Sequence, residues 1–440
     1  MVDKKCLGML AKGVEHWNKW RKSDRYTELD LRGLNLSNET LLGIDFQGVN
    51  LSGAKLIKCN FCGSNFDGAD LTGANLTESN LSGSSFCGVN LTGAVLIRAN
   101  YRGVESTGSN LSLANLSEAD LRVVDFRGAE LSAANLAQAN LNSANFVGAN
   151  LTRANFQLAQ LDSTNFGQAN LTQANLTQAN LTQANLSEAN CVHANLTRAH
   201  LIQADLSEAN LSNTELIQTN LTQADLTGAN IAQADLTKAN LTKANLTQAD
   251  LTKANLGSAN LTKSSLEKTL AWGASFDRSI LTGVCLKNLK INLQTSFVKV
   301  ICQYLYLDNN DRQRLPQNLD ESLSSQEFRL AIQSLLDTVN VIFKEDLDWS
   351  IVLQAVELLK QEYPSHKIRL RAVEANSNYR FVVKLKIYPH QDIEAIVQYF
   401  RDRYQLLSLS KNDLNDLTAV TKTQPPTGSN QPRLNLYQQN

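Results

Sequence analysis

Few side chains in this 440-residue sequence have the type and spacing that catalysis or metal binding requires. Cys59 and Cys62 are spaced like a pair of zinc ligands, but no second pair follows at a usable distance. His193 and His200 fall on outward-facing positions of the repeat described below, in different units, and we expect both to be solvated. No phosphate-binding loop, nucleophile elbow or zinc-binding helix motif occurs. The sequence therefore predicts no enzyme activity, no cofactor and no bound metal.

Charged residues offer binding chemistry instead, and one set of them is acidic. Its members each precede the central residue of a repeat unit and lie at multiples of 20 from one another: Asp45, Glu105, Asp125, Asp205 and Asp225. Such a row could imitate the phosphates of DNA. Residues 31–290, however, hold 20 acidic and 17 basic side chains, whereas duplex DNA carries about one negative charge per 1.7 Å of axis. The charge count therefore argues against a DNA-like rod.

A second charged set is basic and lies near the C-terminus. Six cations alternate with apolar residues: Lys367, Arg369, Arg371, Arg380, Lys384 and Lys386. If the apolar residues face a core, the cations line the open face of a β-hairpin, where an acidic protein, RNA or a lipid headgroup could bind. The alternative is a solvated face whose charges keep the protein soluble and protect the sheet edge. No exposed aromatic platform of the kind that binds single-stranded nucleic acid is evident.

A five-residue repeat positions most of these residues. A large apolar residue recurs at every fifth position from Leu31 to Leu286 without insertion, and counting every fifth residue gives 52 units. The consensus is small–Asn/Asp–Leu/Phe–Ser/Thr–any. Side chains two apart on an extended chain share a face, so the small residue and the Leu point the same way. Because five is odd, the chain must turn a corner in every unit to keep these residues inside one core.

The aromatic residues indicate how many units close one coil. Six phenylalanines at the central position are separated by multiples of 20: Phe46, Phe66, Phe86, Phe126, Phe146 and Phe166. This spacing predicts four units per coil and a structural column of stacked rings on one side. Ser106 interrupts the column, and we expect a locally weak coil there. The 52 units then make about 13 coils, a rod on the order of 60 Å long.

The Ala-Asn/Asp-Leu-Thr/Ser-X pattern resembles the pentapeptide-repeat family, and it covers most of the chain. The resemblance implies an all-β, right-handed quadrilateral β-helix, with the central residue and the small residue two places before it pointing inward. Residues 13–21 look like the leader of cyanobacterial members of the family. The segment 343–349 is similar to the C-terminal extensions of such members. The chain is therefore expected to be a cyanobacterial-type member.

The sequence predicts four segments. Residues 1–28 hold an amphipathic helix over 3–22 that caps the first coil, with a partner-binding helix as the alternative. The β-helix occupies 29–290 and a small α+β domain occupies 291–410. That domain is expected to have helices at 324–337, 350–362 and 392–407 and strands at 338–343, 367–374 and 379–388. Residues 411–440 form a disordered tail.

These features predict a non-enzymatic scaffold in the cytoplasm whose rod serves as a rigid spacer or docking surface for an unidentified protein partner. Charge is balanced, with 41 Lys and Arg against 42 Asp and Glu, so nucleic acid is not expected as a partner. No apolar run is long enough to be a transmembrane segment, and no secretory signal is evident. The alternatives are a DNA-mimicking binder of gyrase, as the family resemblance implies, and a C-terminal domain that binds an anionic partner. The sequence does not predict an oligomeric state.

Overall fold

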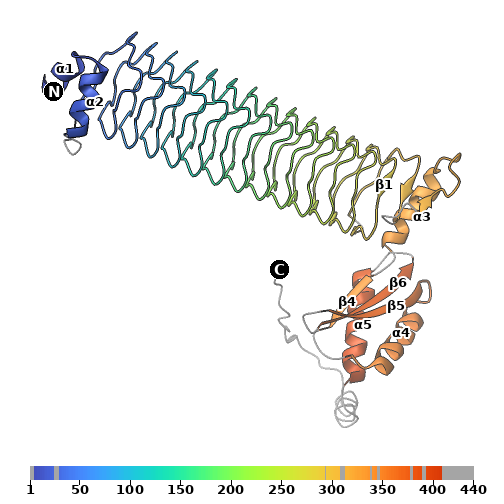
Figure 1. Ribbon diagram of the computed structural model, residues 1–440. Coiled ribbons are helices and arrows are strands. Elements are labelled where there is room, and N and C mark those ends of the chain that lie inside the picture. The colour runs from blue at the N-terminus through green and yellow to red at the C-terminus, as the bar shows by residue number, and fades with distance from the viewer. Residues whose placement is uncertain are drawn as a thin grey trace, which may run out of the picture. The chain divides into compact units, whose positions relative to one another are not determined.

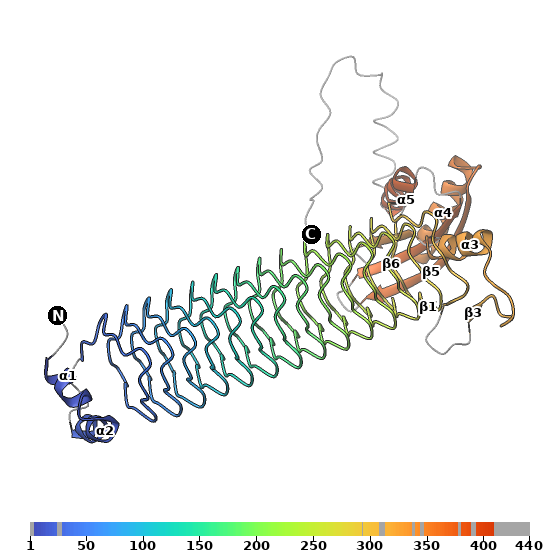
Figure 2. The same cartoon turned by 90° about the horizontal axis from the view of Figure 1, so that it is seen from above.

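The repeat units wind into a stack of four-sided coils, which Figure 1 shows from the side and Figure 2 from above. In this computed structural model each unit forms a parallel bridge with the unit 20 residues later, as Asn155 does with Asn175. The structure describes residues 4–23, 29–292, 294–307, 313–336, 339–343, 347–376, 380–388 and 393–408. The chain divides into two units, Met1–Ile332 and Gln333–Asn440, and each is described by itself.

Hydrogen bonds between coils and within units take up the backbone N–H groups. The N–H of Leu176 donates to the carbonyl of Asn195 in the next coil (2.7 Å), and two other N–H groups of the same unit also bond to neighbouring coils. The N–H of Ala179 closes the turn onto Leu176 (3.0 Å). The remaining donor, the N–H of Thr177, donates to the Asn175 side-chain oxygen (3.1 Å). Where a unit has Asn or Asp at this position, its side chain thus accepts from the one backbone N–H that bonds to no backbone carbonyl.

The fifth residue of each unit turns the corner with a positive φ. Gln178 has a φ of 58°, and the same left-handed conformation recurs at Gly73 and even at the β-branched Val123 (59°). The central and small residues of the units point inward and are almost completely buried, as are Leu176 (0% exposed) and Ala174 (1%). Side chains therefore fill the interior of the coils, and the other three residues of each unit form the outer surface.

Phenylalanine rings stack in a column along one side of the interior. Neighbouring rings of the column have centroids between 4.6 and 5.5 Å apart. The column consists of the six residues that the 20-residue spacing selects: Phe46, Phe66, Phe86, Phe126, Phe146 and Phe166. The column favours one register of the stack, because only a 20-residue coil places these six rings above one another.

The coil at Ser106 is filled, in contrast to the weak coil that the sequence predicts. The ring of Tyr101, from the preceding unit of the same coil, lies 5.2 Å from Phe86 and 6.0 Å from Phe126. Its hydroxyl oxygen is 2.9 Å from Oγ of Ser106, which in turn lies 3.0 Å from Oγ of Ser109. Burial raises the pKa of Tyr101, so the phenol keeps its proton as a hydrogen-bond donor. Ser106 is therefore the polar partner of a buried tyrosine that completes the column.

The coils continue past residue 290, where the sequence predicts their end. One extra residue lies between Lys290 and Ser296, and beyond it the bridges join positions 21 apart, such as Ile280 and Ile301. β1 (Val284–Cys285) pairs in parallel with β2 (Leu305–Tyr306), which pairs antiparallel with β3 (Arg314–Leu315). The insertion breaks a strict five-residue count, which is why the predicted boundary at 290 is wrong. The first unit runs to Ile332 instead.

A helix closes this end of the stack. α3 (Ser325–Leu336) begins in the first unit, and its Phe328 contacts Phe297 with ring centroids 6.0 Å apart. Phe297 in turn stacks on Phe276 of the preceding coil (5.0 Å). The predicted α+β domain at 291–410 therefore assigns the last coil and most of this helix to the wrong unit.

Two short helices, in place of the single predicted one, lie at the first coil. α1 (Lys4–Leu10) and α2 (Val14–Ser23) are separated by residues 11–13, and Gly13, with a φ of +95°, turns the chain just before α2. Trp17 donates from Nε1 to the carbonyl of Asp45 (2.7 Å), and the Asn18 side-chain oxygen accepts from the N–H of Asp45 (2.9 Å). Arg21 donates to the Gln47 carbonyl. In interior coils the backbone groups at the equivalent positions bond to the preceding coil, as the N–H of Asn65 does to the Ile44 carbonyl. The first coil has no preceding coil, and side chains of α2 make these hydrogen bonds instead.

The second unit is a three-stranded antiparallel sheet with two helices. The strand order is β4 (Val339–Phe343), β6 (Arg380–Tyr388), β5 (Lys367–Asn376). α4 (Trp349–Glu362) and α5 (Ile393–Ser408) pack against the strands around a shared apolar core. These bounds lie within two residues of the predicted ones. The predicted tail, 411–440, lies outside the described residues, and the helices that the structure describes are all too short or too polar to span a bilayer.

Tyr101→Leu and Ser106→Phe restore the residues of a regular coil. Together they test whether Tyr101 and Ser106 fill this coil as a pair. Tyr101→Leu alone leaves a cavity and Ser106→Phe alone overfills the coil, so each should cost about 1–3 kcal/mol of stability. The double variant nearly conserves volume and should unfold within about 1 kcal/mol of the wild type. Thermal and denaturant unfolding measure this coupling. Losses that simply add in the double variant would contradict the interaction.

Candidate binding surfaces

The cysteines are not arranged for metal binding or nucleophilic attack. Cys59 is buried, with Sγ 2.9 Å from the Leu36 carbonyl, and Cys62 is exposed on the outside of the same coil, as the repeat register predicts. Burial raises the pKa of Cys59 to about 11 and the pKa values of Cys191 and Cys302 to about 12. These thiols remain protonated near neutral pH and are therefore weak nucleophiles.

The two repeat histidines are exposed and stand apart. His193 turns a corner with a φ of 58°, whereas His200 lies on a flat side and bridges to Asn220 in the next coil. Within the part of the chain that the structure describes, His, Cys, Asp and Glu side chains form no group that could hold a metal ion.

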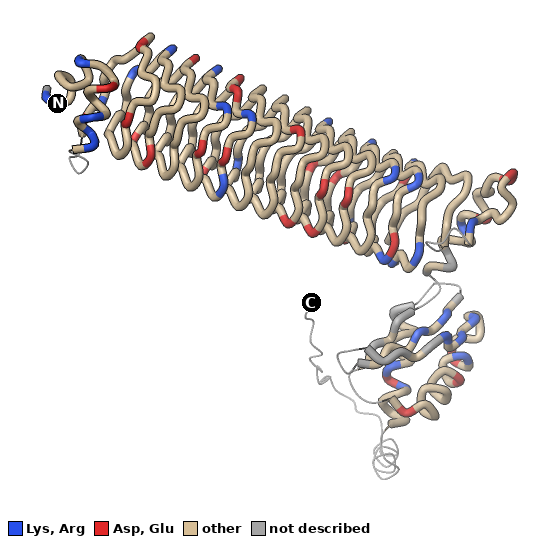
Figure 3. Tube along the Cα trace, in the orientation of Figure 1, with Lys and Arg blue, Asp and Glu red and all other residues tan. Residues whose placement is uncertain are grey.

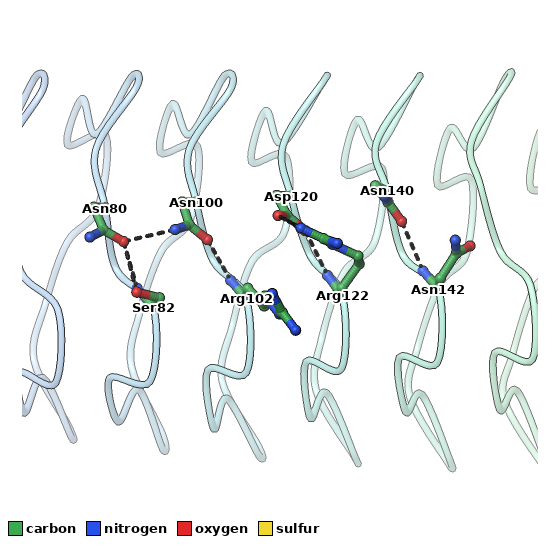
Figure 4. Close-up of polar contacts among 8 residues, drawn as sticks. All are labelled: Asn80, Ser82, Asn100, Arg102, Asp120, Arg122, Asn140 and Asn142. Carbon is green, nitrogen blue, oxygen red and sulfur yellow. Dashed lines mark hydrogen bonds and ion pairs between the residues drawn. The ribbon is translucent and has the colours of Figure 1, made fainter.

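Outward positions recur every 20 residues, so the rod has four flat sides separated by four corner columns. We call one of these the His200 side: it contains His200 and lies between the corner columns that include Gln178 and Gln183. Figure 4 shows its N-terminal part, where Asn100 donates to the side-chain oxygen of Asn80 in the preceding coil (2.9 Å). Such ladders give the side a flat, polar surface.

Charge interrupts this ladder where Figure 4 shows the pair Asp120 and Arg122. The Arg122 guanidinium binds both carboxylate oxygens of Asp120, at 2.8 and 2.6 Å. These hydrogen bonds hold the pKa of Asp120 below its ordinary value, although burial opposes the shift. The pair is self-contained, and this part of the side carries little net charge.

The acidic residues of the predicted row lie on the same side of the rod, but only some of them are neighbours, in pairs. The bridges place Glu105 beside Asp125 and Asp205 beside Asp225. Arg127 lies 2.7 Å from Asp125, and its hydrogen bonds lower the pKa of that carboxyl. The backbone of the remaining member, Asp45, is bound by α2. The row therefore offers short acidic patches in place of a continuous track.

The predicted basic face maps onto β5 and β6 of the second unit. The apolar partners Ile368, Val383, Leu385 and Ile387 are buried in the core with α4 and α5. Of the predicted cations, the structure leaves three exposed and two half-buried, and the side chain of Arg380 lies outside the described residues. The five described cations are Lys367, Arg369, Arg371, Lys384 and Lys386.

A further charged region is hidden in the net charge of the whole rod, because acidic residues elsewhere in the rod offset it. Figure 3 shows Lys and Arg gathered on the last coils. Residues 236–299 contain nine basic and three acidic side chains, whereas 31–235 contain 9 basic and 17 acidic ones. A count coil by coil would have found this asymmetry. α2 also supplies residues whose role the sequence did not reveal, because Trp17, Asn18 and Arg21 bond to backbone atoms far away in the chain.

Comparison with known proteins places the chain in a family. The sequence pattern described as "Pentapeptide repeats" matches overlapping stretches that together cover residues 27–267, more than half of the chain. No protein of curated function matches significantly in sequence.

Among solved structures, HetL from the cyanobacterium Nostoc sp. strain PCC 7120 is 24% identical over 67% of this chain and 98% of its own, with a TM-score of 0.21. HetL is described as involved in the regulation of heterocyst differentiation. QnrB1, a plasmid-mediated fluoroquinolone resistance protein, is 18% identical over 52% of this chain and 95% of its own (TM-score 0.23). Rfr23 from the cyanobacterium Cyanothece 51142 is 32% identical over 23% of this chain and 63% of its own (TM-score 0.15).

With TM-scores this low, the assignment depends on the repeat pattern, which the four-sided coils accommodate residue by residue. The chain belongs to the pentapeptide-repeat family, and its stack of coils is the right-handed quadrilateral β-helix of that family.

Proposed function

We propose that the protein is a non-enzymatic scaffold whose rod is a rigid spacer and docking surface for a protein partner. One observation carries the proposal: the inward positions of the described coils are filled by apolar side chains such as Leu176 and Ala174, so recognition must take place on the outer sides. Cys59 and Cys191 are buried inside the coils and form no disulfide, which suits a reducing compartment, and we place the protein in the cytoplasm. The cyanobacterial-type origin stays a prediction.

The rod's charge favours this proposal over a DNA-mimicking gyrase binder. Its most acidic part, residues 31–235, has a net charge of −8, from 17 acidic and 9 basic side chains. Ten coils at about 4.8 Å each span about 48 Å, over which duplex DNA would carry about 28 negative charges. The acidic pairs Glu105–Asp125 and Asp205–Asp225 do not make up this difference. Interaction with a partner through flat polar sides fits the surface better.

The second unit supports a second candidate, binding of an anionic partner such as RNA or lipid. The register of the sheet sets Arg369 directly opposite Lys386, on the face away from the core. Like charges at opposed positions of a sheet cost stability. A bulge at Arg371 brings a further cation to the same region, beside Lys384. A face that gathers several cations in this way suits an anionic partner.

The scaffold proposal is testable with a photo-crosslinking amino acid at exposed rod positions of the full chain, for example in place of Leu113, Leu158 or Gln203. We expect discrete adducts with one partner at a subset of rod positions. Positions on the second unit, such as Arg401, serve as the comparison. Adducts confined to the second unit would contradict a docking role for the rod. Inhibition of gyrase supercoiling by micromolar protein would contradict it in favour of the DNA-mimic alternative.

The charge opposition in the sheet predicts opposite effects of one substitution. Arg369→Glu places a carboxylate opposite Lys386 and should stabilise the second unit by about 0.2–1 kcal/mol. The same change should weaken binding to anionic vesicles or to RNA if this face is a binding site. Arg401→Glu on α5 is the matched control, because it alters net charge equally at an exposed position away from the strands. Thermal unfolding and vesicle or RNA titration provide the two readouts. A rise in stability with unchanged anion binding would assign the cations to solubility alone.

A further inference from the structure

Charge is segregated by side over the last coils of the rod. Between residues 178 and 304 the His200 side and its two corner columns carry no acidic side chain. They carry six permanent cations in addition to His200: Arg198, Lys238, Lys243, Lys263, Arg278 and Lys299. The other sides of the same coils carry nine acidic and four basic side chains. A nearly neutral stretch of rod thus has one side of charge +6 and a remainder of charge −5.

The six cations are exposed and closely spaced. Five of them, all but Arg198, lie within about three coil steps, which is about 14 Å along the axis. Lys243 and Lys263 occupy one corner column in consecutive coils, and Arg278 and Lys299 occupy the other in the same way. The nearest acidic residue in sequence, Asp277, projects on the neighbouring side and accepts from the N–H of Val298 (2.8 Å). The potential of the cations therefore adds along the side.

Apolar residues lie among these cations. The bridging positions of the side pass from Asn260 to Ile280 and Ile301, and Ile301 is 56% exposed. Ile202 occupies an outward position of the same side nearer the middle of the rod. Apolar contact beside basic residues is typical of protein interfaces, whereas binding of a phosphate backbone uses cations and polar groups alone. The one aromatic ring at the corner columns of this stretch, Tyr304, is covered by the guanidinium of Arg314 (4.6 Å), so it offers no stacking platform.

We propose that the His200 side from Arg198 to Lys299 is a docking surface for an acidic protein segment. The inference deepens the scaffold proposal and depends on it, because it names the side of the rod and the chemistry of the partner. In this proposal, carboxylates of the partner segment lie beside the lysines and arginines of the two corner columns. Apolar side chains of the same segment contact Ile280 and Ile301. Electrostatic attraction of this kind speeds association and selects the partner, and the apolar contact adds affinity.

Variants that the fold itself suggests provide the test. In earlier coils glutamine occupies the same corner columns as Lys243, Lys263 and Arg278, at Gln203, Gln218 and Gln223. The face variant Lys243→Gln, Lys263→Gln, Arg278→Gln therefore keeps residues that suit left-handed corners. The control variant, Lys253→Gln, Lys268→Gln, Lys290→Gln, removes the same charge from the other sides. Lys253 is a close match for Lys263, since both lay their stems over a glycine of the next coil.

Binding of labelled poly-L-glutamate to the full chain is measured by fluorescence anisotropy at about 0.1 M salt, with poly-uridylate of equal length as the second probe. We expect poly-L-glutamate to bind the wild type, and the face variant to lose about tenfold or more in affinity while the control variant loses little. Equal losses in both variants would overturn the proposal, since net charge alone would then act. Absence of binding to the wild type at micromolar protein would also overturn it. Tighter, face-dependent binding of poly-uridylate would assign the side to nucleic acid instead. Each of these outcomes is separate from rod crosslinking, which tests the scaffold role itself.

Discussion

The structure depends on one constraint of the five-residue unit. The chain must turn a corner in every unit, because otherwise successive central residues would point to opposite faces. The turn puts the fifth residue in the left-handed region and leaves the N–H after the central residue without a partner among the coil-to-coil bonds. The Asn or Asp two places earlier accepts that N–H, as Asn175 does from Thr177, and the Thr hydroxyl bonds the same oxygen (2.6 Å). In one unit Glu130 replaces the Asn and still accepts from the N–H and the hydroxyl of Ser132. In two others Lys55 and His200 stand at this position, and the residue two places later, Ile57 or Ile202, has no hydroxyl.

This constraint explains how much of the fold can be predicted from sequence. The five-residue period, the 20-residue coil and the Phe column can be predicted from residue spacing alone. Each coil of a regular stack contacts only its neighbours, so the same spacing repeats along the rod. The elements of the second unit also follow closely from apolar alternation and capping. Features that depend on contacts between distant residues do not. The ring of Tyr101 fills the gap at Ser106, the extra residue before Ser296 shifts the register, and Gly13 divides the N-terminal helix, and none of these is visible in local periodicity.

The same constraint places function on the outer surface. Two of five residues in each unit are committed to the interior and one Asn or Asp to the backbone, so the corner residues and the flat sides are the positions that can vary. Acidic pairs such as Glu105 and Asp125 lie on one side, and cations collect on the His200 side of the last coils. Some charges elsewhere form ion pairs, as Asp120 does with Arg122. The candidate surfaces could not be found from total charge, because a balanced sum conceals segregation by column. The cations of the second unit were found because strand alternation places them directly.

A rigid rod with 20 residues per coil is the central claim, and a distance between two spin labels tests it most directly. Lys58→Cys and Ser258→Cys lie in one corner column, ten coils apart, with the partly exposed native cysteines replaced by serine. Double electron–electron resonance should give one narrow distance distribution centred near about 48 Å. Three units per coil would place the labels about 64 Å apart. A distribution near that distance, or a broad one, would contradict the account.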